Sequence, residues 1–284
     1  MNYRNISDSA AWPHTVIDHH TYLRLDETIS PWACIEGFQI ENVSFDILHN
    51  LFLGTARDLV ASAISVLIRQ HVYDHVEGNA ESILGYIQRE MARDCKSFGL
   101  YMPKKPALSE AALNFGEYPE LSGKFKAAHV KLLLFWFARK TQEVADAAQE
   151  DRVLQALATC CYAIHRFVDI LDHADLIVDR DSGELSLLHT RAYTWLSACY
   201  LNRRIMLFKI RPKFHYLWHQ AVTLKTWRIN VGVFANWDEE ALLGKVKFIA
   251  VACHGRTVTQ RVFERYLLVF ALTIHRHSEL EALS

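Results

Sequence analysis

Two short acidic segments, far apart in the chain, have the residue types for metal-dependent chemistry. Asp46 follows a β-branched apolar run and opens a helical pattern that reads DILHNLFLG. Three consecutive acids, Asp238 to Glu240, follow another apolar run and open a pattern that contains Gly244. Carboxylates suit hard divalent ions, and they also cap helices and offset the helix dipole. Both interpretations stay open, and we expect Asp46 and Glu240 to approach each other.

Histidines are the second set of candidates. His215 and His219 are four residues apart, so one helix face presents two imidazoles, a spacing that a metal can use. No acid separates them and no third ligand is near in sequence, which favours core histidines or phosphate-contacting residues over zinc. Cys253 and His254 are adjacent, and this pattern favours a structural role for them over a metal site. Four polar residues share one further predicted helix, namely His165, Asp169, Asp172 and His173. This arrangement favours a solvated helix face over an ion site.

The elements that must position these residues are mostly helical. The 284 residues include only 11 Gly and 6 Pro, and apolar residues recur at spacings of three and four over most of the chain. We expect helices over 45–72, capped by Ser44 and kinked or broken at Gly54, and over 81–95, 121–149, 151–175, 184–208, 215–225, 239–253 and 258–277. Short strands are expected at 37–43 and 227–235, a loop around one short helix at 101–119, and a turn at Asp179–Gly183.

This pattern predicts a mainly α fold with four segments. Residues 1–36 are irregular, and 37–75 form a strand–helix unit around Asp46. Residues 76–210 are a long helical region. Residues 211–284 form a second strand–helix unit, which contains Glu240 and ends in a basic helix. We find no internal repeat and no low-complexity segment.

Composition excludes several classes of protein. Apolar residues make up 51% and charged residues 22%, which is neither disordered nor collagen-like. The first residues lack a signal-like apolar run, and the longest apolar stretches are too short to span a bilayer, so we expect an intracellular protein without a membrane partner. The six cysteines are expected to be reduced thiols without disulfides. No cofactor is expected to be needed for folding.

The net charge of −1 hides an uneven distribution. Residues 201–284 carry 13 Lys and Arg against 6 Asp and Glu, so the C-terminal third is basic. Such a balance suits a polyanionic partner or a solvated surface equally well. If the partner is DNA, the candidate contacts are Arg203, Arg204, Lys209, Arg211, Lys213, Lys245, Lys247, Arg256, Arg261 and Arg265.

Three motifs in order resemble the catalytic domain of DDE/D transposases, most closely the CACTA (En/Spm)-like and related eukaryotic group. The segment around Asp46 resembles the Asp-x-Met/Leu-His-x-x-x-Leu-Gly motif of the second catalytic aspartate. Residues 212–219, PKFHYLWH, resemble the Pro-x-x-His-x-x-x-His segment, and 240–244, EALLG, resemble the Glu-x-x-x-Gly motif. The resemblance covers about residues 31–277.

The resemblance implies a ribonuclease H-like α/β core, present here as remnants that flank a large helical insertion. It further implies that Asp46 and Glu240 are catalytic carboxylates that bind Mg²⁺ or Mn²⁺. His49, His215, His219 and Gly244 would then lie near the site. Two metal ions in such a core activate the attacking oxygen and stabilise the leaving one during DNA strand transfer.

The chain departs from this family at its beginning. Only 45 residues precede Asp46, and they offer neither three strands nor the first catalytic Asp, since Asp18 and Asp26 lie outside strand-like runs. We therefore expect a fragment, split gene product or remnant that is inactive alone. Its partners would be DNA, a missing N-terminal half or further copies of itself, in the nucleus if it is functional.

Two other classes of function remain. One is a non-catalytic helical module for protein interaction or DNA association. The other is a metal-dependent helical-bundle enzyme that uses the histidines, which needs at least three converging ligands. The separation of the Asp46 and Glu240 carboxylates distinguishes the first of these from the transposase hypothesis.

Overall fold

The computed structural model describes residue 10 and residues 17–24, 31–40, 43–115 and 118–282. These residues form a mainly helical protein, as the sequence predicts, and within them the only β pairing is an isolated bridge between Ile177 and Ile229. The chain divides into two compact units, Met1–Ala235 and Asn236–Ser284.

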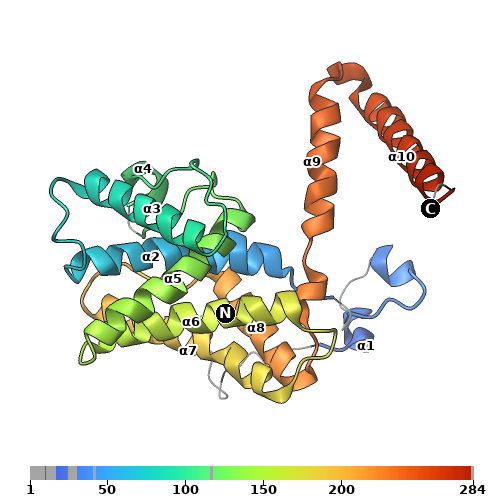
Figure 1. The fold of residues 1–284 in the computed structure, drawn as a ribbon. Coiled ribbons are helices and arrows are strands. Elements are labelled where there is room, and N and C mark those ends of the chain that lie inside the picture. The colour runs from blue at the N-terminus through green and yellow to red at the C-terminus, as the bar shows by residue number, and fades with distance from the viewer. Residues whose placement is uncertain (1–9, 11–16, 25–30, 41–42, 116–117, 283–284) are drawn as a thin grey trace. The chain divides into compact units, whose positions relative to one another are not determined.

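The first unit contains eight α-helices and three helical turns of other types among its described residues (Figure 1). The α-helices are α1 (His19–Tyr22), α2 (Ala56–Arg69), α3 (Ala80–Ser97), α4 (Glu110–Leu113), α5 (Ala127–Ala147), α6 (Arg152–His173), α7 (Arg180–Asn202) and α8 (Pro212–Trp227). The others are the 3₁₀ turns η2 (Pro31–Cys34) and η5 (Val231–Phe234) and the π-helix η4 (Leu48–Thr55).

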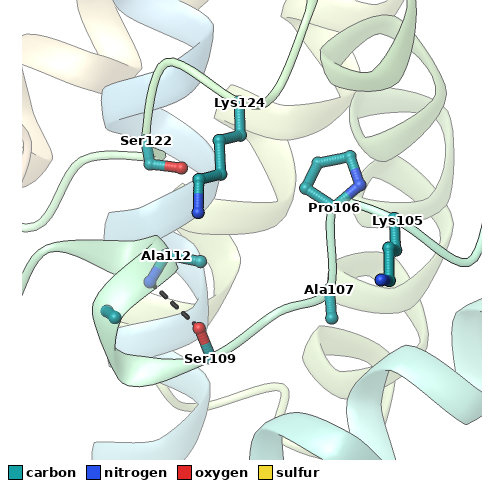
Figure 2. A pocket seen from close by; sticks show the side chains of 8 residues that line it. Lys105, Pro106, Ala107, Ser109, Ala112, Ser122 and Lys124 are labelled. Atoms are coloured by element: carbon teal, nitrogen blue, oxygen red, sulfur yellow. Dashed lines mark hydrogen bonds between the residues drawn. The ribbon is translucent and has the colours of Figure 1, made fainter.

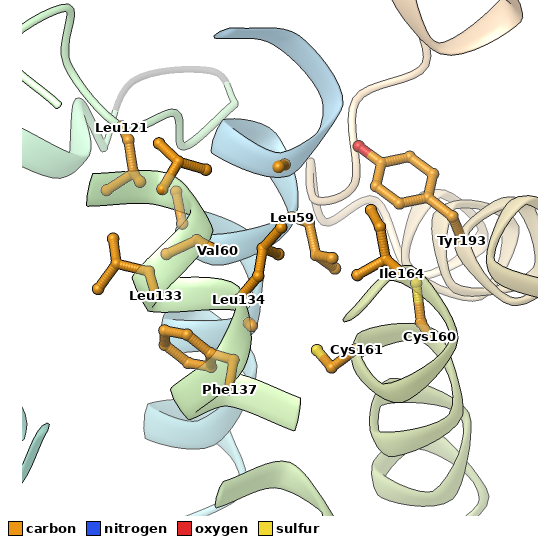
Figure 3. Packing of buried hydrophobic residues seen from close by; sticks show 14 of the residues in the cluster. Leu59, Val60, Leu121, Leu133, Leu134, Phe137, Cys160, Cys161, Ile164 and Tyr193 are labelled. Atoms are coloured by element: carbon orange, nitrogen blue, oxygen red, sulfur yellow. The ribbon is translucent and has the colours of Figure 1, made fainter. Parts of the chain in front are cut away.

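The core of this unit lies between α2, α5, α6 and α7. Figure 3 shows Leu59 of α2 facing Leu134 of α5, with Ile164 of α6 and Tyr193 of α7 on the other side. α2 is buried on nearly every side, which explains why its sequence is apolar all round. By length and composition alone, the helical stretch Leu48–Arg69 is apolar enough to cross a membrane. In the structure, 83% of its most apolar part is buried inside the protein, as in the core helix of a folded domain.

Local sequence signals placed most helices correctly. Asn79 and Asp151 accept backbone N–H groups at the starts of α3 and α6, and α4 is the short helix expected within 101–119. The six cysteines form no disulfide, and Cys95, Cys160 and Cys161 are buried. α5 begins at Ala127, six residues later than predicted, because residues 121–126 form turns.

The predicted turn at Asp179–Gly183 is wrong. Asp179 caps α7 instead, with its carboxylate accepting the Ser182 N–H at 2.8 Å, and Gly183 lies inside that helix. Gly183 is there because α8 passes close by: a Cβ at this position would lie 2.9 Å from the Cα of Lys225. The glycine marks a helix crossing and not a turn.

The predicted strand at 227–235 is also wrong. α8 runs to Trp227, and Val231–Phe234 form η5. Buried Asn230 explains this, because its amide donates to the carbonyls of Leu171 and Ala174 at the end of α6. Its side-chain oxygen accepts the Gly232 N–H, which folds the following residues into a turn. The described residues of the other predicted strand, 37–40 and 43, are not in a strand, while 41–42 lie outside the described residues.

The second unit contains α9 (Trp237–Val251), the 3₁₀ turn η6 (Gly255–Thr257) and α10 (Val258–Ala282), which pack against each other. Both helices were expected. Within this unit large apolar side chains remain exposed, including Phe248 at 82% and Phe263 at 65%. α9 lacks the single apolar stripe that one partner helix would cover.

Candidate functional site

Asp46 lies at the entrance to η4 and organises its first turn. One carboxylate oxygen accepts the Leu48 N–H at 2.9 Å, and the other pairs with Nδ1 of His49. The Asp46 side chain is 18% exposed. Asp46 therefore takes the capping role that the sequence assigned to Ser44, whose hydroxyl only approaches its neighbour's carbonyl at 3.5 Å.

Gly54 forms the expected kink. Leu53 and Gly54 leave helical geometry between η4 and α2. A Cβ on Gly54 would lie 2.9 Å from the backbone oxygen of His49 and 2.8 Å from Cδ of Lys213. Contacts this short do not occur at real Cβ atoms, so the kink requires glycine at this position.

The kinked segment packs directly on α8. Nζ of Lys213 donates to the Leu53 carbonyl at 3.0 Å, and the Gln220 amide donates to the Phe45 carbonyl at 2.6 Å. The Phe45 ring stacks on Tyr216 with centroids 4.6 Å apart. Two of the three motifs singled out in the sequence, the Asp46 segment and residues 212–219, therefore lie side by side.

His215 and His219 face each other across one turn of α8. Their Nε2 atoms are 3.0 Å apart, so one ring donates to the other. Burial, together with the neighbouring His215, lowers the pKa of His219 to about 4, which keeps the His219 ring neutral near pH 7. The pair sits beside Phe45, whose ring centroid lies 5.9 Å from that of His219.

No three His, Cys, Asp or Glu side chains converge as metal ligands within the described residues. On α6, Asp169 pairs with Arg166 and His173, and Asp172 pairs with Lys131. Across the α9–α10 connection, Cys253 donates to the Ile249 carbonyl while His254 accepts the Arg256 N–H. These contacts are consistent with a solvated polar face on α6 and with a structural role for Cys253 and His254.

A partly buried ionic cluster around buried Asp58, next to α8, was not expected from the sequence. Arg211, the residue before α8, pairs with Asp58 of α2 and with Glu120, and Arg57 lies 3.7 Å from Glu120. Burial raises the pKa of Asp58 to about 7 although Arg211 opposes the shift. A single acid within the apolar pattern of α2 is the sequence signal that marks this position.

The basic residues predicted to contact DNA fall into two groups. Arg211 is engaged by acids, and burial lowers the pKa of Lys213, with Arg211 and Arg57 adding to the effect. In the second group, Lys209 is half-buried and the other residues are exposed. The exposed residues are Arg203 and Arg204 after α7, and Lys245, Lys247, Arg256, Arg261 and Arg265 in the second unit. Arg261 pairs with Glu264.

Glu240 and Gly244 lie in α9 of the second unit, and the Glu240 side chain is outside the described part of the structure. Gly244 is exposed, and a Cβ there would meet none of the described atoms within 4 Å, so no close contact requires a glycine at this position. The approach of Asp46 to Glu240 stays a prediction.

Comparison of the chain with protein-family models, curated proteins and solved structures found no match.

Proposed function

We propose that this chain derives from a DDE/D transposase of the CACTA (En/Spm)-like and related group and keeps part of its site for metal-dependent DNA strand transfer. One observation carries the proposal: the Asp46 segment and residues 212–219 pack on each other through the Lys213–Leu53 and Gln220–Phe45 hydrogen bonds. More than 150 positions separate the two motifs in the sequence, and a chance match of short motifs gives no reason for them to meet.

In this proposal Asp46 and Glu240 would hold Mg²⁺ or Mn²⁺, which would activate and stabilise the oxygens of a scissile phosphate. The donors of the first unit do not make such a site alone, because Asp46 is the only carboxylate of the motif there. The Leu48 N–H and His49 orient its carboxylate, and the paired imidazoles of His215 and His219 lie across the same helix contact.

In this proposal the chain has no DNA strand-transfer activity by itself. Two-metal phosphoryl transfer needs several carboxylates to offset two dications and to bridge them. Residues 1–284 contain no motif that corresponds to the first catalytic Asp of the family. Asp46 and Glu240 would then bind a single ion weakly, and cleavage would require a further acid that residues 1–284 do not supply.

Binding of Mn²⁺ followed by electron paramagnetic resonance tests the proposal on the full chain without an activity assay. We expect one weakly bound ion whose affinity falls about tenfold in Asp46→Asn and in Glu240→Gln, since each removes a ligand. Glu239→Gln is the matched control on the same helix turn and should leave binding unchanged. Equal binding by wild type and both site variants, or no bound ion at all, contradicts the proposal.

A non-catalytic helical interaction module is the second candidate. The observation that favours it is the apolar surface of the second unit, where Phe248, Val251 and Phe263 are each more than half exposed. This candidate gains if Mn²⁺ does not bind and an experimental structure puts the Asp46 and Glu240 carboxylates well beyond about 10 Å, too far to share a pair of ions.

A further inference from the structure

A pocket of about 600 Å³ lies in the first unit, and neither Asp46 nor any α8 residue lines it (Figure 2). Three pieces of backbone surround it: the loop before α4, α4 itself, and the turn that follows residue 121. Its volume is within the range of small-molecule sites. The proposed function does not use it.

Side-chain hydrogen bonds hold the walls of this pocket in place. Gln88 of α3 spans the first loop, with its amide donating to the Lys104 carbonyl at 3.2 Å and its oxygen accepting the Leu108 N–H at 2.7 Å. The Ser122 N–H donates to the Ala112 carbonyl at 2.8 Å, which ties the turn to α4. Nε of Arg57 donates to the Leu121 carbonyl at 2.8 Å. The pocket is therefore formed before any ligand arrives.

The polar groups in the pocket are cations and a hydroxyl. Lys105 and Lys124 both line it, and neither pairs with an acid in the part of the chain that the structure describes. Oγ of Ser122 is buried without a hydrogen-bond partner, whereas Oγ of Ser109 is occupied by the Ala112 N–H. A buried hydroxyl without a partner is costly unless a ligand or water satisfies it.

The remainder of the lining is small and apolar, and among the described residues no acid contributes to it. Pro106, Ala107, Ala111 and Ala112 supply this surface. Figure 2 shows Ser122 and Lys124 on one side and Lys105 with Pro106 on the facing side. An anionic group is thus favoured near the lysines, while a compact apolar group fits against proline and alanine.

We infer that this pocket binds a small molecule that carries a phosphate monoester on a compact apolar body. A phosphate monoester has a charge near −2 at neutral pH, which matches two lysines better than a carboxylate does. Lysine binds phosphate as a point charge, and the two lysines supply the charge here, since the Ser122 hydroxyl is covered.

Isothermal titration calorimetry on the full chain at low salt tests this inference, with phenyl phosphate as the probe and benzoate and inorganic phosphate for comparison. Phenyl phosphate should bind about tenfold more tightly than either, because only it satisfies both the cations and the apolar wall. Lys105→Gln and Lys124→Gln should each weaken binding about fivefold, in line with the loss of one charge-assisted hydrogen bond.

Lys104→Gln is the matched control, because Lys104 is exposed and adjacent but does not line the pocket. It should bind phenyl phosphate like wild type. No saturable binding of phenyl phosphate, or equal losses in Lys104→Gln and Lys124→Gln, overturns the inference. Displacement of phenyl phosphate by a short DNA duplex also overturns it, since the phosphate group would then belong to a nucleic acid.

Discussion

Replacement of Gly54 by alanine tests the packing on which the proposed site depends. The new Cβ would lie 2.9 Å from the His49 oxygen, a backbone atom that moves only if η4 moves, and 2.8 Å from the more adaptable Cδ of Lys213. The kinked segment must therefore distort and the Lys213 side chain must shift, which puts the Lys213–Leu53 hydrogen bond at risk.

The cost follows from these two effects. Overpacking of this kind costs about 1–3 kcal/mol, and the lost hydrogen bond adds about 1 kcal/mol. We expect Gly54→Ala to reduce the free energy of unfolding by about 2–4 kcal/mol, which lowers Tm by about 6–12 °C for a protein of this size.

Gly85→Ala is the matched control within the same unit. Gly85 lies inside α3, and its new Cβ would meet only the tip of Arg89, at 3.4 Å. Alanine should therefore stabilise α3 by up to about 1 kcal/mol through its higher helix propensity. Urea unfolding followed by circular dichroism measures both variants, and Gly54→Ala with stability equal to wild type would refute the packing argument.

Three further outcomes are expected. His189 is buried, neither ring nitrogen makes a hydrogen bond of normal geometry, and burial lowers its pKa to about 3. Because the unfolded chain binds this proton near pH 6.5, stability should fall as pH drops from 6.5 towards 3, by about 2 kcal/mol at pH 5 from this residue, and urea titrations of His189→Leu should lack that component. In mobility-shift assays the chain should bind duplex DNA weakly and lose binding steeply with added salt through counterion release; no shift at low ionic strength contradicts this. With Mg²⁺ or Mn²⁺ the chain alone should not nick plasmid DNA, and nicking that disappears in Asp46→Ala and Glu240→Ala would show that an acid within 1–36 replaces the first Asp.

Local interactions explain what the sequence determined by itself. Helix periodicity, the caps at Asn79 and Asp151 and the kink at Gly54 all depend on residues within a few positions of one another. These signals were sufficient to predict a mainly α chain and the order of its helices. The Asp46 segment and residues 212–219 were singled out because the residue types and short spacings of each segment resemble family motifs, and such a pattern is also local in sequence.

Tertiary structure decided the features that depend on distant residues. Gly183 is inside a helix because α8 crosses there, and 227–235 is not a strand because Asn230 bonds to the end of α6. The pairing of Arg211 with Asp58 joins positions 153 residues apart, and no local pattern specifies such a partner. A buried charge or amide must find a partner wherever the fold supplies one, so these contacts are fixed by packing of the whole unit and not by neighbouring sequence.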